Sequence, residues 1–498
     1  MPDNRAISAT TFGPAINSAT EPDSAPDEAR PFAGPPSARR EPERLVGSGG
    51  VRFWALMWGL GIAGQLCWNI ENQWFNTFVY AKIAKDSTIV TWMVIVSALV
   101  TTFSTFLFGT WSDRAGSRRR FVSIGYIAWG VLTIAFGLTQ YLASGTVGDG
   151  AKVSILVAAL VVLADAVMSF FGSMGNDSGY NAWSNDMTSD ANRGQVGAVL
   201  ATVPVIGTIA GTILGGLLIG ADDNYQRLFW TMGLIVIAVG VVSLFTLRDS
   251  DRLRPRRDGT FWHQFASVFH LKGFFAQREL ALACLTTALF FIPFNVYFVH
   301  MGNWIIYRMG FGPDSMGLIQ GLGLLLASVL VIPAGILINR HRVPLVATIA
   351  VGLNIAGLVL ITVGVRPGTV DPTTVFSLKN LPLFVAVFLA GAGYILVIQS
   401  MTMWVKQLYP QDSRGQFEGV RILFFTLIPM IIGTAIGNII VTRGAGTIVN
   451  AQGITENIPT ESIFFWAAIL AVWTFIPLRV TAVLYRRRVA SHQEKESQ

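Results

Sequence analysis

The sequence predicts an all-α membrane protein of twelve transmembrane helices, arranged as two six-helix bundles related by a parallel duplication. Three observations lead to this fold class: the composition, the recurrence of long apolar stretches, and an internal repeat. Of the 498 residues, 52% are hydrophobic and 13% are charged, whereas a soluble protein carries about 25% charged residues. So few charges cannot cover soluble domains, which excludes a soluble enzyme, a nucleic-acid-binding protein and a disordered scaffold.

The apolar stretches are long enough to cross a hydrocarbon layer of about 30 Å. We expect helices at residues 53–81, 88–111, 121–143, 153–183, 196–220, 228–246, 280–306, 315–338, 344–365, 381–405, 417–440 and 462–484. The first six form a bundle over residues 49–246, and the last six form a second bundle over residues 280–485. A middle loop of residues 247–279 joins the two bundles.

The two ends differ from the rest in composition. Residues 1–48 hold eight of the 21 prolines and few large apolar residues, which is too little apolar surface to offset the entropy of ordering the chain. We expect a disordered tail, and not a signal peptide, because no apolar core precedes a small-residue cleavage site. Residues 486–498 are polar and are predicted to form a second tail.

The distribution of basic residues predicts the orientation. With the N-terminus inside, 26 of the 36 Lys and Arg residues lie in tails and loops on one side of the membrane, and eight lie on the other. Because Lys and Arg collect on the cytoplasmic side, we expect a multi-pass protein of the cell membrane with both termini in the cytoplasm. The net charge of +7 then reflects topology and attraction to anionic lipid, and no nucleic-acid partner is expected.

An internal repeat relates the two halves. The loop after the second helix, Gly109–Arg120, and the loop after the eighth, Gly335–Arg342, each place an acid or its amide four residues after glycine, followed by arginine. Their offset is 226 residues. Trp183 and Trp404, at an offset of 221, are each followed ten residues later by Arg-Gly-Gln. Matching pairs at similar offsets indicate two duplicated six-helix halves.

The loop Gly109–Arg120 resembles the signature loop of the major facilitator superfamily, and the resemblance covers residues 49–485. It implies two bundles that rock about a central cavity to give alternating access. Its carboxylate can accept bonds from helix N-termini and pair with arginine across the halves, a latch that favours the outward-open state. The alternative is a solvated basic turn that only sets topology. The gating residues would be Gly109, Asp113, Arg114, Gly116, Arg118 and Arg340.

The stretch from Asp177 to Gly194 further resembles the sugar–cation symporters of the glycoside–pentoside–hexuronide group and the related sucrose transporters. In that group a carboxylate at the position of Asp177 binds sugar. The group also carries two carboxylates for sodium on the second helix, where this chain has Thr101 and Thr105. The resemblance therefore implies a proton rather than sodium as the coupling cation.

Polar residues inside the first and fourth helices are candidate site residues, because a charge within the membrane costs about 2.5–3.5 kcal/mol. Amides bond hydroxyl groups and an indole packs on a sugar ring, while burial disfavours a charged carboxylate. In the first helix the substrate-binding candidates are Trp68, Asn69, Glu71 and Asn72, and in the fourth they are Asn176, Asp177 and Tyr180. The candidate proton carriers are Glu71, Asp165 and Asp177. Helix packing and interhelical bonds are the alternative roles.

The seventh and tenth helices mirror this pattern in the second half. The seventh carries Asn295, His300, Asn303 and Trp304, and the tenth carries Gln399 after a glycine-rich segment. Glycine-rich helices at corresponding places in both halves are typical of transporter sites. His300 could relay protons near neutral pH or remain a neutral, hydrogen-bonded side chain.

The resulting prediction is a transporter of a small polar solute, a sugar or glycoside, by proton-coupled symport, acting as a monomer in the lipid bilayer. Efflux is the alternative, since Gly207–Gly216 resembles the glycine motif of drug exporters, with Thr212 in place of proline; close helix packing needs the same glycines. A membrane enzyme lacks support, as no nucleophile elbow or phosphate loop is present. Cys67 and Cys284 lie in apolar stretches and no ligand cluster has metal spacing, so no metal or cofactor is expected.

Overall fold

The apolar stretches fold as helices, because a helix in a bilayer satisfies its own backbone hydrogen-bonding groups. The computed structural model describes residues 50–144, 155–189, 191–257, 259–267, 271–409, 420–444, 446–449 and 455–496. All the elements named below belong to one unit, Glu43–Gln498. The predicted tail of residues 1–48 and the repeated Arg414-Gly-Gln triplet lie outside the described residues.

The first half contains six membrane-crossing stretches. The first runs through α1 (Val51–Asn69), a π-helical turn (Ile70–Trp74), α2 (Phe75–Phe78) and a second π-helical turn (Val79–Ile83). The others are α3 (Ser87–Ala115), α4 (Arg119–Gly137) with the short α5 (Gln140–Ser144), α6 (Ile155–Gly172) continued by a π-helical segment (Ser173–Tyr180) and α7 (Asn181–Asp186), α8 (Arg193–Ile219) and α9 (Tyr225–Thr246).

Two short helices of the middle loop, α10 (Phe261–Ser267) and α11 (Leu271–Ala276), precede the second half. That half contains α12 (Arg278–Asn303) with a π-helical turn (Trp304–Arg308), α13 (Pro313–Ser328), α14 (Val331–Asn339), α15 (Val343–Gly364), a 3-10 turn (Leu378–Asn380) leading into α16 (Leu381–Gln407), a π-helical turn (Leu423–Leu427) leading into α18 (Ile428–Arg443), α19 (Ser462–Val472) and α20 (Phe475–Glu496).

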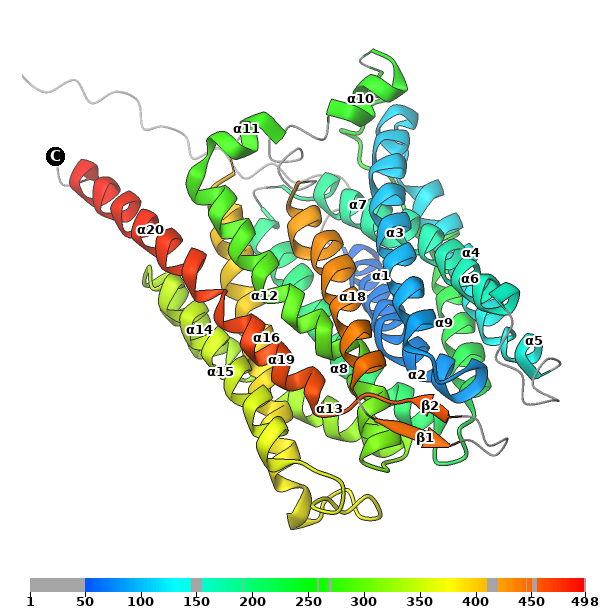
Figure 1. The fold of residues 1–498 in the computed structure, drawn as a ribbon. Coiled ribbons are helices and arrows are strands. Elements are labelled where there is room, and N and C mark those ends of the chain that lie inside the picture. The colour runs from blue at the N-terminus through cyan, green and yellow to red at the C-terminus, as the bar shows by residue number, and fades with distance from the viewer. Residues whose placement is uncertain are drawn as a thin grey trace, which may run out of the picture. The chain divides into compact units, whose positions relative to one another are not determined.

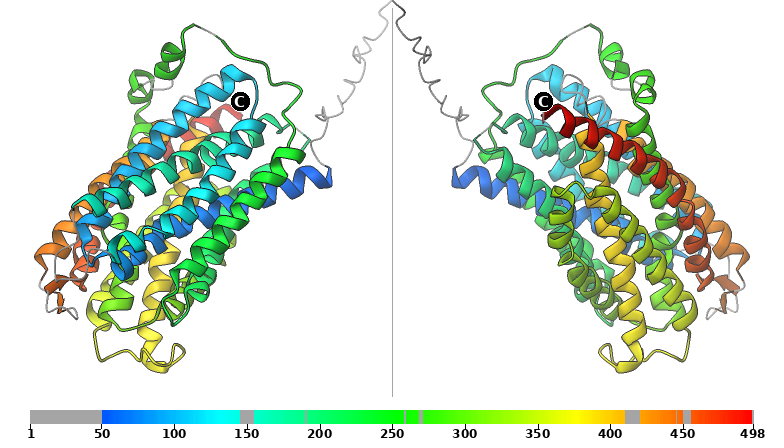
Figure 2. Two further views of the ribbon diagram at one scale, coloured as in Figure 1. Left: turned by 90° about the vertical axis from the view of Figure 1, so that its right-hand side faces the viewer. Right: turned by 90° about the vertical axis from the view of Figure 1, so that its left-hand side faces the viewer.

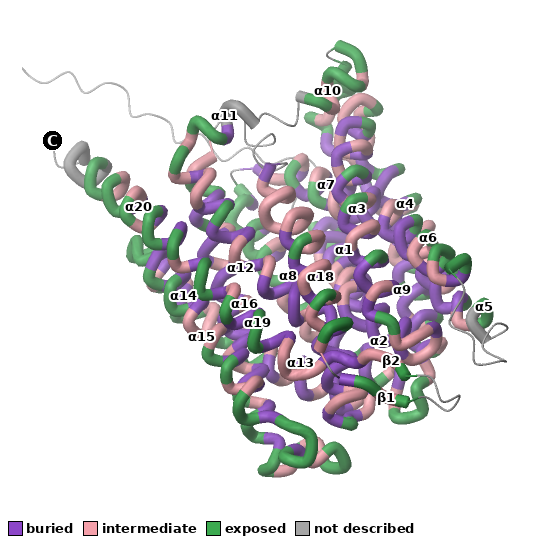
Figure 3. Tube along the Cα trace, viewed as in Figure 1, coloured by how far each residue is buried: buried purple, intermediate pink, exposed green. Residues whose placement is uncertain are grey.

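The predicted fold class is confirmed. Within the described ranges, eleven helical stretches are long and apolar enough to cross a membrane. The helical stretch that begins with α1 is not among these eleven and brings the number of membrane-crossing helices in the described residues to twelve. Glu71 and the amides around it make this stretch more polar than the others. The outward faces carry exposed apolar side chains such as Phe245, Ile332 and Val363, and the buried residues gather between the helices (Figure 3).

Three features differ from the prediction. The last helix, α20, continues to Glu496 rather than ending at residue 484, and Arg488 on this extension pairs with Glu279 of α12 at 2.9 Å. The loop after α18 contains an antiparallel hairpin, β1 (Thr447–Val449) and β2 (Thr455–Asn457). The π-helical turns add residues to a helical turn, and no pattern of apolar spacing predicts them.

The two halves meet along two seams. Helix α8 packs against α13, and α3 packs against α18, so α8 and α18 lie between the rest of the two halves (Figure 1). Backbones approach closely at the first seam, where a Cβ atom on Gly216 would lie 2.6 Å from the carbonyl oxygen of Pro313 and 3.1 Å from Cα of Gly317. Glycines at this place let the halves approach without side chains between them.

The repeat is visible in the tryptophans that defined it. Trp183 and Trp404 are both fully buried. The Trp183 indole N–H donates to the carbonyl oxygen of Arg248 at 2.9 Å, and the Trp404 indole N–H donates to Glu279 Oε1 at 2.9 Å. Each indole therefore ties the end of its helix to a chain segment beside the middle loop.

Hydrogen bonds and an ion pair join the halves on one side of the molecule, which we call the hairpin side because β1 and β2 lie there (Figures 1 and 2). Ser87 Oγ donates to Asn438 Oδ1 at 2.5 Å, and Lys85 pairs with Glu456 of β2 at 3.1 Å. Asn303 Nδ2 donates to the carbonyl oxygen of Asn76 at 3.2 Å. The opposite side carries the loop between α3 and α4, and we call it the signature-loop side.

Alternating access requires the hairpin-side contacts to separate during each cycle. Cysteines that replace Ser87 and Asn438 and are joined by a short reducible cross-linker are expected to lower the transport rate more than tenfold, because the halves cannot part on this side. Reduction of the cross-linker should restore the rate. The controls are the two variants with only one of the introduced cysteines; the native Cys67 and Cys284 are buried in both. An unchanged rate in the cross-linked protein would rule out this seam as a moving contact.

Candidate functional site

A cluster of acids and hydroxyls lies between α3, α6 and the π-helical turn that follows α1. Glu71 sits in the π-helical turn after α1, and its Oε1 accepts hydrogen bonds from Ser97 Oγ of α3 at 2.8 Å and Ser169 Oγ of α6 at 2.7 Å. The two serine oxygens are 2.8 Å apart. Asp165 lies one turn before Ser169 on α6 and interacts electrostatically with Glu71. Glu71 and Asp165, two of the candidate proton carriers, are thus both buried in the first half.

The acid cluster is closed off from solvent. Glu71 is 7% exposed and Asp165 is 1% exposed. Glu71 Oε2 and Asp165 Oδ1 are buried without a hydrogen-bond partner. A buried polar atom without a partner is costly. Binding of a proton by one of these two acids would remove a charge that burial disfavours.

Asp177 lies about two turns after Ser169 on the same helical stretch and is half-buried. Its Oδ2 accepts a hydrogen bond from Ser173 Oγ at 3.1 Å, and the Trp68 indole lies near the carboxylate. Trp68 and Asn72 are also half-buried, and Asn72 Nδ2 donates to the carbonyl oxygen of Trp68 at 2.8 Å. Trp68 therefore lies beside Asp177, and Asn72 lies one turn after Trp68 on the first helical stretch.

Three other candidates of the first half are held in helix contacts. Asn69 lies against Gly211 of α8, and Thr212 Oγ1 donates to its Oδ1 at 3.4 Å. Tyr180 donates from its hydroxyl to the carbonyl oxygen of Met57 at 2.8 Å. Asn176 packs on Gly64, with its Nδ2 buried and unpartnered.

The candidates on α12 face neighbouring helices rather than one another. Asn295 and His300 pack on Gly433 and Gly437 of α18, and both ring nitrogens of His300 are buried without a partner. Trp304 is fully buried against Phe464 of α19, with ring centroids 4.8 Å apart. Asn303 belongs to the hairpin-side seam described above. Gln399 of α16 is half-buried and donates to the carbonyl oxygen of Val331 at 3.1 Å.

A small cavity of about 50 Å³ opens between the halves. Two hydrogen-bonded amides line it: Gln73 Nε2 donates to Gln320 Oε1 at 2.8 Å. Behind them, Thr212 Oγ1 donates to Gln73 Oε1 at 2.9 Å. Gln320 Nε2 is then buried without a partner. The two amides thus leave a hydrogen-bond donor for an acceptor that enters the cavity.

Aromatic rings also line the cavity. Phe294 of α12 stacks on Tyr394 of α16 with ring centroids 4.5 Å apart and planes 11° apart, and on Phe298 at 4.7 Å and 20°. Tyr297 also lines the cavity, and its hydroxyl accepts from Asn354 Nδ2 at 3.1 Å. Flat rings and amides around one cavity combine apolar and polar lining groups. At about 50 Å³ the cavity is far below the roughly 300–1,000 Å³ of small-molecule sites, so a solute ring would enter only after the halves move apart here.

Ser97 and Gln320 are not among the site residues predicted from the sequence, and the pairing of Gln73 with Gln320 was not predicted. Ser97 is a single small hydroxyl in an apolar helix, which packing alone explains as well as function does. Gln320 is an amide in the apolar stretch of α13, and this isolated polar group was the available signal. The partner of Gln73 lies 247 residues away, so no local spacing indicates the contact.

The signature loop forms an ion-pair network within the first half. Arg118, 6% exposed at its side chain, pairs with Asp113, and its Nε pairs with Asp186 Oδ2 at 2.8 Å. Burial opposes the charge on the Arg118 guanidinium, but the Asp113 and Asp186 carboxylates outweigh it and raise the pKa of Arg118 above its ordinary value. We expected Asp113 to pair across the halves; in this structure its arginine partner belongs to its own half, because the α3–α4 turn folds Arg118 back onto it.

The remaining gating candidates lie around this network. Gly116 ends α3 with φ of 64°, a left-handed conformation that favours glycine. Arg114 donates to Gln264 of α10 at 3.1 Å. Gly109 lies near Ser178, 3.8 Å from the position of a Cβ atom. Arg340 is exposed at the end of α14 in the second half.

The Asp113→Asn variant is expected to keep its expression and surface level but to transport about tenfold more slowly. Asparagine loses the charge that holds Arg118, and a hydrogen bond to a charged group contributes about 1.5–3 kcal/mol. Initial rates in proteoliposomes measure the effect, with Asp251→Asn, an exposed acid outside the network, as the matched control. Equal rates in the two variants would leave the loop with a topological role only.

The glycine run of α8 packs against the first helix. Cβ atoms on Gly207, Gly211 and Gly215 would lie within 2.6 Å of Gln65, Asn69 and Trp74 respectively. The Trp74 indole N–H also donates to the carbonyl oxygen of Gly211 at 3.1 Å. The packing role of these glycines, one of the two readings that the sequence allowed, is therefore present in the structure.

Two six-helix halves with buried polar groups between them define a multi-pass membrane transporter. The chain belongs to the Major Facilitator Superfamily, whose family model matches residues 57–434. None of the curated protein sequences compared with the chain matches it.

Solved structures share the fold. The crystal structure of the nucleoside transporter NupG matches with a TM-score of 0.60 at 12% identity, over 86% of this chain and 99% of that one. A bacterial homolog of the human lysosomal transporter Spinster, in an inward-facing and unoccupied conformation, matches with a TM-score of 0.58 at 16% identity, over 88% of this chain and 97% of that one. At these identities the likeness establishes the fold alone.

Proposed function

We propose that the protein carries a small hydroxylated solute, a sugar or glycoside, together with a proton by alternating access. The observation that carries the proposal is the buried pair Glu71 and Asp165, in which Glu71 accepts hydrogen bonds from two serine hydroxyls and Asp165 Oδ1 has no partner. A charge at this depth is costly, and a proton removes it. The pair is therefore suited to take up a proton on one side of the membrane and release it on the other.

The fourth helical stretch links the proton site to the solute face. Ser169 bonds Glu71, and Ser173, one turn later, bonds Asp177. Movement of this stretch changes both contacts together. Protonation of Glu71 would thereby alter the position of Asp177, which provides coupling between proton and solute.

The half-buried side chains of Trp68, Asn72 and Asp177 support a hydroxylated solute. The carboxylate and amide bond hydroxyl groups, and the indole packs on the apolar face of a sugar ring. The amide–aromatic cavity across the seam offers the same pairing of chemistries, with Gln320 and Tyr394 in place of Asp177 and Trp68. A solute between the two sites would contact both halves, as alternating access requires.

The protein is further proposed to lie in the cell membrane with both termini in the cytoplasm and to act as a monomer. The signature-loop side would then be cytoplasmic and the hairpin side extracellular. The seam through Ser87–Asn438 and Lys85–Glu456 would be the external gate in its closed position.

A thermal-shift screen of the purified protein against a sugar and glycoside library finds the solute, and flux in proteoliposomes tests the function. The proposal expects an inward proton gradient to drive accumulation of the solute without chemical change. Outward solute flux driven by inward proton flux would instead establish an efflux antiporter. Chemical conversion of the solute would establish an enzyme.

A further inference from the structure

A basic cavity of about 660 Å³ lies on the signature-loop side, apart from the sites described above for solute and proton. Its charged lining consists of five arginines and two aspartates. These are Arg118, Arg252, Arg254, Arg256, Arg257, Asp113 and Asp186. Polar groups of Asn185, Thr188 and Ser250 also line the cavity, together with Leu253 and Pro255. The cavity therefore carries an excess of positive charge beside neutral hydrogen-bonding groups.

The nearby acids already have partners. Asp113 and Asp186 both pair with Arg118. Asp249 accepts from Ser117 Oγ and from the backbone N–H groups of Arg118 and Arg119 at 2.7–2.8 Å. These acids offset one guanidinium and two backbone amides, and the exposed Arg254 and Arg257 add positive charge to the lining of the cavity.

The arginine segment is fixed in place rather than trailing in solvent. The N–H of Arg256 donates to the carbonyl oxygen of Asp113 at 2.9 Å. Pro255 covers Gly116, where a Cβ atom would lie 2.7 Å from the proline ring. The segment is thus docked on the signature loop at two points, which holds several guanidinium groups around one volume.

The surroundings of the cavity indicate a membrane surface. Trp111, two residues before Asp113, is 52% exposed, and Trp262 of α10 is 65% exposed. Helix α10 is held on α3 by Phe265 against Phe103, with ring centroids 6.0 Å apart. Exposed tryptophans at the end of a transmembrane helix are typical of the level of the lipid headgroups.

We propose that this cavity binds the phosphate of an anionic phospholipid headgroup. Arginine pairs with phosphate through charge-assisted, often bidentate hydrogen bonds, and the exposed tryptophans place the site at the headgroup level. The bound phosphate would lie beside the Asp113–Arg118–Asp186 network, so lipid composition would act on the signature loop. This site does not depend on the identity of the transported solute or on proton coupling.

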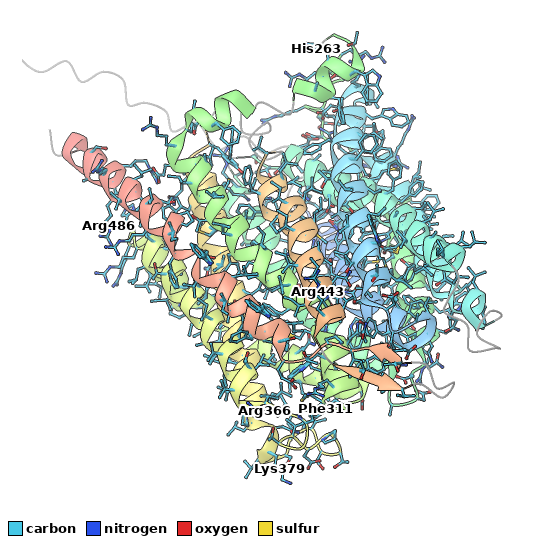
Figure 4. The ribbon with its side chains drawn as sticks, in the orientation of Figure 1. His263, Phe311, Arg366, Lys379, Arg443 and Arg486 are labelled. Atoms are coloured by element: carbon cyan, nitrogen blue, oxygen red, sulfur yellow. The ribbon has the colours of Figure 1, made fainter. Side chains whose placement is uncertain are left out.

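The test uses the full chain in phosphatidylcholine nanodiscs with and without phosphatidylglycerol. Binding of phosphatidylglycerol by native mass spectrometry and the shift in Tm are the two readouts. Removing two basic residues near a lipid surface weakens binding by about thirtyfold, so Arg254→Gln/Arg257→Gln is expected to lose that much affinity and most of the Tm shift. The matched control is Arg486→Gln/Arg487→Gln on exposed turns of α20, since Arg486 lies away from α10, where His263 is labelled (Figure 4).

Each outcome decides the proposal. Wild-type affinity in the control, with affinity retained in Arg254→Lys/Arg257→Lys and lost in the glutamine variant, supports it. An unchanged Tm of the glutamine variant in pure phosphatidylcholine shows that this variant folds. Equal losses in the α20 control and the cavity variant would overturn it in favour of general surface charge. An equal Tm shift from inorganic phosphate in pure phosphatidylcholine would overturn the lipid assignment and indicate a soluble anion.

Discussion

Replacing Glu71 with glutamine is expected to abolish proton-driven accumulation of the solute, with a fall of more than tenfold in the accumulation ratio, while solute exchange stays within about twofold. Glutamine fits the same space, and its amide oxygen can accept from Ser97 and Ser169 as the carboxylate does. It cannot take up a proton. Comparison of gradient-driven uptake with counterflow in proteoliposomes measures the two functions separately.

The control for Glu71→Gln is Ser97→Ala, which removes a hydrogen bond from the same cluster but no titrating group. It is expected to retain accumulation, and Asp165→Asn is expected to reduce accumulation less than Glu71→Gln does. Full accumulation in Glu71→Gln would remove the acid cluster from the coupling mechanism.

The second large effect is expected at Asp177. Asp177→Ala removes a half-buried carboxylate that is positioned by Ser173 near Trp68, and loss of hydrogen bonds to a charged group costs about 1.5–3 kcal/mol each. Solute affinity should fall about a hundredfold while Tm stays close to that of the wild type. Titration of the purified protein with the best compound of the thermal-shift screen provides the measurement.

Two further variants separate a direct contact from an indirect one. Ser173→Ala removes only the positioning bond and is expected to weaken affinity less than tenfold. Gln320→Leu tests the amide–aromatic cavity, because leucine cannot offer the donor that Gln320 Nε2 leaves unpaired. Retained affinity in Asp177→Ala together with a large loss in Gln320→Leu would show that the solute binds in the amide–aromatic cavity and not at Asp177.

The fold was predictable from the sequence because length and apolarity alone define membrane helices. The exceptions have local causes. Helix α20 extends past residue 484 because Arg488 reaches Glu279. The hairpin β1–β2 contains only six residues in its strands, too few to be distinguished from a polar loop.

The candidate site was predictable in part. Glu71, Asp165 and Asp177 are each conspicuous as acids in apolar stretches. Their arrangement was not, because the π-helical segments at Ile70–Trp74 and Ser173–Tyr180 change which residues share a face. The contacts between Gln73 and Gln320 and between Lys85 and Glu456 join positions 247 and 371 residues apart, and a single sequence carries no signal for such pairs.

The most direct test of proton-coupled transport is the movement of protons when solute is added to weakly buffered proteoliposomes without an imposed gradient. Proton symport is expected to make the external medium more alkaline as the solute enters in the wild type. In Glu71→Gln the solute should still equilibrate, but with no change of external pH. Solute entry without proton movement in the wild type, or acidification of the medium, would rule out proton symport.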